Sequence, residues 1–265
     1  MKILIRGAGD LATGIAAELW ERGHQILMTD VAIPLTVRRE VAFSRAVYEE
    51  HAVVEGIEAV LADNFEEAET IMATRKIAVM VDEKAEVRKE YLPDVLVDGI
   101  MAKKNLGTRI SDAPLVIGIG PGFTAGEDVD VVIETKRGHN LGRVIRSGSA
   151  VPNTGIPGII GGYGKERVMH AQAEGILRNV ASIGDIVEAR AVIAEIETEN
   201  GTVPVEASLS GLLRGLIRDG YPVTKGFKIA DIDPRQEELQ NCFTISDKAR
   251  CIAGSVLEVI CGELE

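Results

Sequence analysis

The sequence predicts an α/β protein with a parallel-sheet domain first, a small all-β domain second and a helix at the end of the chain. Over the first 140 residues, short apolar runs alternate with stretches of helical spacing, which is typical of a parallel sheet covered on both faces. Residues 171–197 then align without gaps to 207–233 at a constant offset of 36 residues, with nine identical pairs. Because chance would give only about one or two identities, the second domain is predicted to be a duplicated unit.

The elements of the first domain begin with a strand at 2–6, a helix at 10–22 and a strand at 25–29. Later elements are helices at 36–50 and 64–75 and strands near 52–56, 57–62, 77–82, 94–101, 113–120 and 130–135. The predicted domains are 1–140 for the parallel sheet, 141–167 for a Gly/Pro-rich connection, 168–235 for the duplicated unit and 236–265 for a C-terminal helical segment.

The composition indicates a soluble cytoplasmic protein. The net charge of −12 opposes binding to phosphate backbones and anionic lipids, so no nucleic-acid or membrane partner is expected, while a homo-oligomer is left open. No apolar run is long enough to span a bilayer. Cys242, Cys251 and Cys261 lack the close pairing of a zinc site, and we interpret Cys251 and Cys261 as packed residues of the last helix. A reactive thiol is the alternative.

The turn after the first strand carries the clearest chemical signal. Gly7, Gly9 and Ala12 satisfy the G-x-G-x-x-A pattern between a strand and a helix, which is the context of a Rossmann-type dinucleotide site. Asp30 ends the next strand, where a carboxylate could accept hydrogen bonds from ribose hydroxyls. Asp10 adds a negative charge beside the expected phosphate position, so a Rossmann-type domain with no ligand remains the alternative.

A second glycine-rich turn follows a later strand in "GIGPGFTAGEDVD" (118–130), and it makes Gly120, Gly122 and Thr124 further cofactor-binding candidates. Cationic side chains concentrate in the stretches 101–109 and 134–145 of an otherwise acidic chain, which favours an anion held at the domain border; the candidates are Lys103, Lys136, Arg137 and His139. A plain connection and a solvated edge are the structural alternatives. No catalytic triad, paired carboxylates or metal-ligand spacing is evident, so catalytic residues stay unassigned and no metal is expected.

The duplicated unit resembles lipoyl and biotinyl carrier domains, with "GDIVEARAVIAEIET" and "TVPVEA" close to their pattern. The resemblance implies a small barrel-sandwich domain with a hairpin at Glu199, Asn200 and Gly201. These carriers attach their prosthetic group to a lysine at this tip. Because the amide of Asn200 cannot form that bond, we expect no covalent lipoate or biotin and a role in packing or in holding a partner.

Several motifs together resemble the YqeB-type accessory proteins of selenium-dependent molybdenum hydroxylase systems. They include "RGAGDLATGIA" (6–16), "MAKKNLGTRI" (101–110), "GSAVPNTGIPGIIGGY" (148–163) and "IADIDPR" (229–235). The resemblance implies a maturation or cofactor-handling role, with a molybdenum hydroxylase or its maturation factors as partners. The cofactor expected is a dinucleotide, either NAD or a molybdopterin dinucleotide. An NAD-dependent oxidoreductase and a structural scaffold with an empty site are the alternatives, so enzymatic activity is left open.

Overall fold

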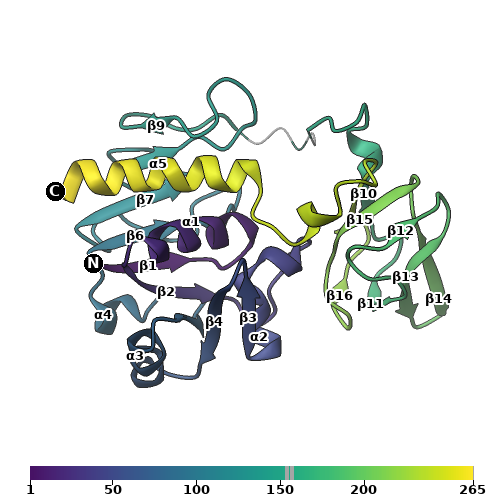
Figure 1. Cartoon of the computed structure of the whole chain (residues 1–265), viewed down its shortest axis with the longest axis horizontal. Coiled ribbons are helices and arrows are strands. Elements are labelled where there is room, and N and C mark those ends of the chain that lie inside the picture. The colour runs from purple at the N-terminus through teal and green to yellow at the C-terminus, as the bar shows by residue number, and fades with distance from the viewer. Residues whose placement is uncertain (153–154, 156–157, 265) are drawn as a thin grey trace. The chain divides into compact units, whose positions relative to one another are not determined.

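The computed structural model describes residues 1–152, 155 and 158–264 and divides the chain into two compact units (Figure 1). Unit 1 comprises Met1–Pro34, Ala42–Thr154 and Ile245–Glu265, and unit 2 comprises Leu35–Val41 and Gly155–Thr244. Both units are discontinuous in sequence, whereas the sequence suggested contiguous segments. The expected connection at 141–167 includes residues 153, 154, 156 and 157, which lie outside the described residues.

Unit 1 is built on a nine-stranded sheet in the order β3-β4-β5-β2-β1-β6-β7-β8-β9. The strands are β1 (Lys2–Arg6), β2 (Gln25–Asp30), β3 (His51–Val54), β4 (Ile57–Ala62), β5 (Ile77–Val81), β6 (Val95–Asp98), β7 (Leu115–Ile119), β8 (Val131–Ile133) and β9 (Val144–Ile145). Every pair from β4 across to β8 is parallel, and β3 and β9 pair antiparallel at the two edges. The predicted large parallel sheet is therefore confirmed, and the carboxyl ends of its parallel strands share one edge.

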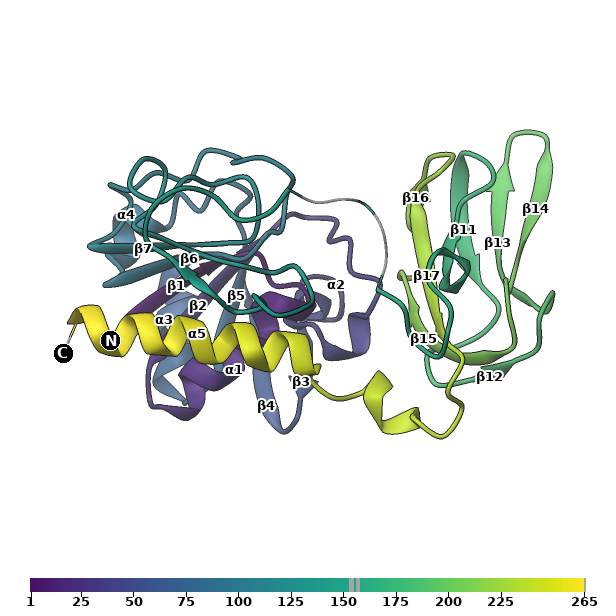
Figure 2. The ribbon, with the colours of Figure 1, turned by 90° about the horizontal axis from the view of Figure 1, so that it is seen from above.

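The C-terminal helix completes unit 1. The helices of this unit are α1 (Asp10–Glu21), α2 (Ala46–Glu49), α3 (Phe65–Ala73), α4 (Arg88–Tyr91) and α5 (Asp247–Leu264). Figures 1 and 2 show α5 running beside α1, although more than 200 residues separate them in sequence. A Cβ on Gly14 would lie 2.8 Å from the Cβ of Ala249, so a glycine is needed for this close approach of the two helices.

The predicted helix at 36–50 is wrong. The region contains only two 3₁₀ turns, Arg39–Val41 and Phe43–Arg45, followed by the four-residue α2. Residues 35–41 instead form part of unit 2, where the Val37 carbonyl accepts the N–H of Leu216 at 2.8 Å. Arg39 in turn donates from Nε to the Leu216 carbonyl at 3.1 Å. These tertiary hydrogen bonds hold the segment in a conformation that its local helical spacing does not favour.

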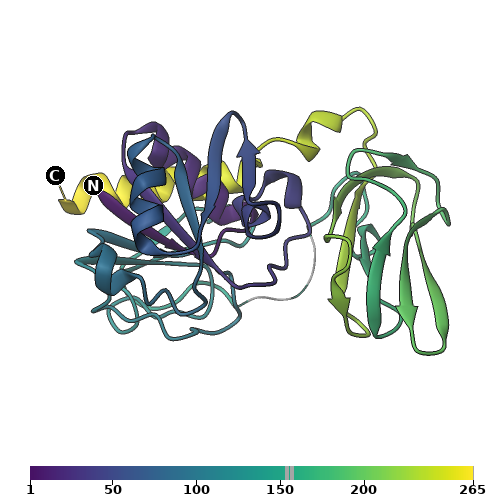
Figure 3. The same cartoon turned by 90° about the horizontal axis from the view of Figure 1, so that it is seen from below.

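Unit 2 consists of two four-stranded sheets, in the orders β10-β17-β15-β12 and β14-β13-β11-β16 (Figure 3). The strands are β10 (Val168–His170), β11 (Gly175–Asn179), β12 (Ile186–Val187), β13 (Val192–Thr198), β14 (Gly201–Glu206), β15 (Gly211–Leu216), β16 (Pro222–Val223) and β17 (Lys228–Asp233). Short 3₁₀ turns at Lys165–Arg167 and Leu239–Cys242 flank them. The order of one sheet becomes the order of the other when each strand is exchanged for its counterpart: β10 for β14, β11 for β15, β12 for β16 and β13 for β17. The duplication seen in the sequence is thus a duplication of structure.

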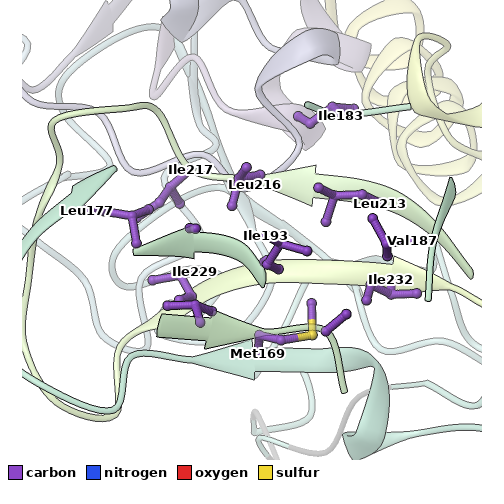
Figure 4. Close-up of a cluster of buried hydrophobic side chains, with 14 of the residues drawn as sticks. Met169, Leu177, Ile183, Val187, Ile193, Leu213, Leu216, Ile217, Ile229 and Ile232 are labelled. Carbon is purple, nitrogen blue, oxygen red and sulfur yellow. The ribbon is translucent and has the colours of Figure 1, made fainter. Parts of the chain in front are cut away.

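Equivalent glycines fix the same close contact in each half. A Cβ on Gly175 would lie 2.1 Å from the Glu197 carbonyl oxygen, and one on Gly211 would lie 2.5 Å from that of Asp233. The expectation that Gly175 and Gly211 occupy equivalent positions is confirmed. Between the sheets, apolar side chains from both halves meet in one core, among them Leu177 and Leu213 (Figure 4).

The β13–β14 hairpin has Asn200 exposed at its tip. The Thr198 hydroxyl donates to the Gly201 carbonyl at 2.7 Å, and Gly201 takes a positive φ of 117°. The hairpin therefore presents the Asn200 amide at its exposed tip.

Candidate ligand-binding edge of unit 1

The turn between β1 and α1 lies against the end of β6. Gly7 has a φ of 92°, and a Cβ there would lie 3.0 Å from the backbone nitrogen of Ile100. Ala12 faces the same neighbour, since a Cβ on Gly99 would approach the Ala12 Cβ to 3.1 Å. Gly7 and Ala12 are thus both required by packing, which is one of the functions these positions have in a phosphate-binding turn.

Gly9 differs from Gly7 because its backbone does not require a glycine. Its φ of −72° and ψ of −177° are accessible to any residue, and it occupies the N-cap position of α1. Because Gly9 has no side chain, the N-cap position supplies no side-chain acceptor for the N–H groups in the first turn of α1. Gly9 is therefore the position in the turn where a side chain could be added without backbone strain.

Asp30 lies directly against the glycine turn. Its Oδ2 accepts the N–H of Ala8 at 2.9 Å, and its Oδ1 accepts the N–H of Val31 at 2.8 Å. Burial raises the pKa of the Asp30 carboxyl, although these two N–H donors partly oppose the shift. Each carboxylate oxygen has a second lone pair, so the group can still accept a hydroxyl from a ligand at the turn.

The second glycine turn packs against the neighbouring loops of the same edge. Gly120 has a φ of 80°, and a Cβ there would lie 2.7 Å from Thr135 Oγ1. Gly122 has a φ of 114°, and its Cβ would lie 3.0 Å from the Lys104 backbone. The loops that follow β6, β7 and β8 are thereby packed together at one edge of the sheet.

Thr124 has a local structural role. Its N–H donates to Asp128 Oδ2 at 2.8 Å, and its hydroxyl lies 3.2 Å from the hydroxyl of Ser149. The N–H thus stabilises the turn itself, and the hydroxyl links the turn to Ser149.

The predicted cations separate into two groups. Arg137 forms a bidentate ion pair with Asp247 of α5, at 2.8 and 2.9 Å. Lys103, Lys136 and His139 have exposed side chains. Arg137 is therefore held against the C-terminal helix, whereas the other three side chains lie exposed on their loops.

Arg6 is a structural residue of this edge that the sequence analysis treated only as part of a strand. Its side chain is buried and donates to Thr108 Oγ1 at 2.9 Å and to the carbonyls of Glu83 and Leu106 at 2.9 and 3.0 Å. It also pairs with Asp98 at 3.5 Å. The sequence signal that could have identified this role is a charged residue at the end of an otherwise apolar strand. Through these hydrogen bonds, Arg6 holds the loops after β5 and β6 against the end of β1.

Lys248 is the second residue that sequence reasoning missed. It lies in the first turn of α5, next to the Ala249 that packs on α1. Burial lowers the pKa of Lys248, as does Arg137, while the charges of Asp10, Glu134 and Asp247 raise it. No local pattern could have identified Lys248, because its surroundings depend on the packing of α5 against α1.

The cysteine interpretation needs correction. Cys242 is buried in unit 2, whereas Cys251 and Cys261 are exposed on α5. The buried stripe of this helix is formed instead by Ile252, Val256, Val259 and Ile260. Within the described residues, no group of three or more His, Cys, Asp or Glu side chains is arranged to hold a metal ion. None of the helices described is long and apolar enough to cross a lipid bilayer.

Comparison with known proteins gives one close sequence relative. No family model matches the chain. An uncharacterized Escherichia coli protein, YqeB, is 48% identical over 259 residues, which is 97% of this chain and 47% of YqeB. The chain thus spans about half the length of this relative.

Solved structures give only weak similarity. A succinylglutamate desuccinylase/aspartoacylase from Rhodobacter sphaeroides is 13% identical, with a TM-score of 0.30, over 87% of this chain and 84% of its own. An aspartoacylase family protein from Mesorhizobium loti is 11% identical over the same shares, also with a TM-score of 0.30. Similarity at this level carries no argument about activity. The sequence match, in contrast, is a clear similarity to about half of YqeB.

Proposed function

We propose that unit 1 is a Rossmann-type domain that binds a nucleotide-containing ligand at the carboxyl edge of its sheet. The observation that carries the proposal is the Gly7–Asp10 turn, which joins β1 to α1 with the Asp30 carboxylate hydrogen-bonded to its backbone. The strand order adds support. Strands β2, β5 and β4 extend from β1 on one side, and β6, β7 and β8 extend on the other. In open α/β sheets, ligands bind where the strand order reverses in this way.

We further propose that the protein is an accessory protein for the maturation of a selenium-dependent molybdenum hydroxylase, with a molybdopterin dinucleotide as ligand. The support for this role is the resemblance of the sequence motifs to YqeB-type accessory proteins, since the similar YqeB of Escherichia coli is itself uncharacterized. Unit 2 would then be a lipoyl/biotinyl-type barrel that holds a partner rather than a prosthetic group, since Asn200 occupies the hairpin tip. An NAD-dependent oxidoreductase would use the same turn, and turnover of NADH would distinguish it.

The first test is a thermal-shift measurement with NAD, ADP and CDP. A ligand at about 100 times its dissociation constant should stabilise the folded protein by about 2.7 kcal/mol. The Gly9→Val variant adds no backbone strain, because φ and ψ at this position suit any residue, and it should lose the response to nucleotides. An unchanged response in Gly9→Val would remove the site from this turn, and no response from either protein would favour an empty scaffold.

The carboxylate of Asp30 should make the site discriminate between ligands. A 2′-phosphate would approach a carboxylate already fixed against the turn, so NAD should bind about tenfold or more tightly than NADP. Isothermal titration of both dinucleotides measures this ratio. The Asp30→Asn variant should reduce the preference, whereas equal affinities in the unmodified protein would contradict contact between Asp30 and the ribose.

A further inference from the structure

The duplication of unit 2 gives it two equivalent ends, each formed by the turns on either side of a short strand, β12 or β16. The same backbone hydrogen bonds close the turns at both ends, at positions that the 36-residue repeat makes equivalent. They run from Gly220 to Leu177 (2.8 Å) and from Phe227 to Thr224 (3.0 Å) at one end, and from Gly184 to Leu213 (2.9 Å) and from Ala191 to Glu188 (3.0 Å) at the other. Because the backbone is the same, the fold itself does not dictate how the side chains of the two ends differ.

The two ends carry opposite charge. One end, here named the cationic end, consists of residues 170–174 and 217–228, whose ionisable groups are Arg218, Lys225, Lys228 and His170 with Glu174, Asp219 and Tyr221. The equivalent segments, 206–210 and 181–192, carry Arg190 with Asp185, Glu188 and Glu206. Asp219 lies 3.7 Å from Arg178, so its charge is partly met by a further cation. A cationic surface thus occurs in a chain whose net charge is −12.

An aromatic pair lies among these cations. The rings of Tyr221 and Phe227 stack with their centroids 5.6 Å apart, and both side chains are half-buried at the margin of the core. Lys228 follows Phe227 directly and lies opposite His170 in the β10–β17 pair, with both of these side chains exposed. Lys225 is exposed in the turn before Phe227. Aromatic residues are enriched in protein interfaces, and clustered cations recognise acidic segments.

A segment of the chain packs on the other end. A Cβ on Gly184 would lie 3.1 Å from the Phe243 ring and 3.5 Å from Leu239, and both residues belong to the segment that follows β17. At the equivalent Gly220, such a Cβ would lie 3.6 Å from Arg178 and would meet no other group within 4 Å among the residues described. A peptide segment therefore already packs on one copy of this surface, and the cationic copy lacks that cover.

We propose that the cationic end binds an acidic peptide segment of a partner protein. Carboxylates of the peptide pair with Lys225 and Lys228, and an apolar side chain packs on the Tyr221–Phe227 pair. The proposal rests on the partner-holding role proposed for unit 2. A nucleic acid fits this surface less well, because its continuous line of phosphates would extend past the cationic end onto an acidic chain.

Fluorescence polarisation with a labelled glutamate-rich peptide that contains one tryptophan tests this surface. Lys225→Glu should weaken binding about tenfold or more, because a repulsive charge replaces an attractive one. Arg190→Glu is the matched control, since it makes the same charge change at an exposed position of the equivalent end, and it should change the affinity less than about twofold. The same peptide with glutamine at every glutamate position should bind about tenfold or more weakly to the unmodified protein.

Three results would overturn the proposal. They are equal weakening by Lys225→Glu and Arg190→Glu, no binding of the glutamate-rich peptide by the unmodified protein, and tighter binding of a single-stranded oligonucleotide of the same charge. Lys225 and Arg190 are exposed, so circular dichroism should show both variants folded. The thermal response to ADP concerns unit 1, and measuring it on the same variants separates a failure of this surface from a failure of the proposed nucleotide binding.

Discussion

Replacing Gly211 by valine is expected to destabilise unit 2 by about 3 kcal/mol or more. The new Cβ would lie 2.5 Å from the Asp233 carbonyl oxygen and 2.8 Å from the Ile232 side chain. The first obstacle is the backbone of the paired strand, so no side-chain rotation relieves it. Gly175→Val should have a similar effect, because the equivalent Cβ would lie 2.1 Å from the Glu197 carbonyl.

Urea unfolding followed by circular dichroism measures both effects. Gly254→Ala is the matched control, since Gly254 is exposed on α5 and a Cβ there meets nothing within 4 Å. This control should stabilise α5 by about 0.5–1 kcal/mol. Normal stability of both valine variants would show that the two halves do not share this close contact.

Replacing Arg6 by methionine is expected to cost about 3–5 kcal/mol, the usual loss when one partner of a buried ion pair is removed. Asp98 is only 2% exposed and would be left buried without the guanidinium, which lowers its pKa against the effect of burial. The carbonyls of Glu83 and Leu106 would lose their donor as well. Because these groups belong to loops at the candidate edge, nucleotide binding should weaken together with stability.

A double variant separates the charge from the other contacts of Arg6. Arg6→Met with Asp98→Asn removes both charges, while the amide oxygen of the new side chain could still accept the Thr108 hydroxyl that donates to Asp98 at 2.6 Å in the unmodified protein. The double variant should therefore recover part of the stability lost by Arg6→Met. If it is less stable than the single variant, the ion pair is not the main contribution of Arg6.

Local sequence patterns predicted the sheet and the duplication well. The β1–turn–α1 unit follows from an apolar strand, two glycines and helical spacing, all close together near the start of the chain. The repeat followed from identical residues such as Gly175 and Gly211, which are needed because the paired strand approaches each closely. In both cases the signal was present in the sequence itself, as a short motif or as a repeated residue.

The failures share a different cause, which is contact between distant segments. The 36–50 region has helical spacing, yet hydrogen bonds to Leu216 hold residues around Val37 in unit 2. The C-terminal helix seemed a separate segment, yet Gly14 and Ala249 join it to α1. Lys248 could not be recognised for the same reason.

Hydrogen exchange measured by mass spectrometry, with and without saturating ADP, tests most directly whether unit 1 binds a nucleotide at its glycine turn. We expect slower exchange in peptides that cover residues 7–13 and 245–250, with smaller effects at 99–104 and 120–124. Peptides from β11 and β15 in unit 2 should exchange at unchanged rates. Protection confined to unit 2, or ADP binding without any protection of residues 7–13, would contradict nucleotide binding at this turn.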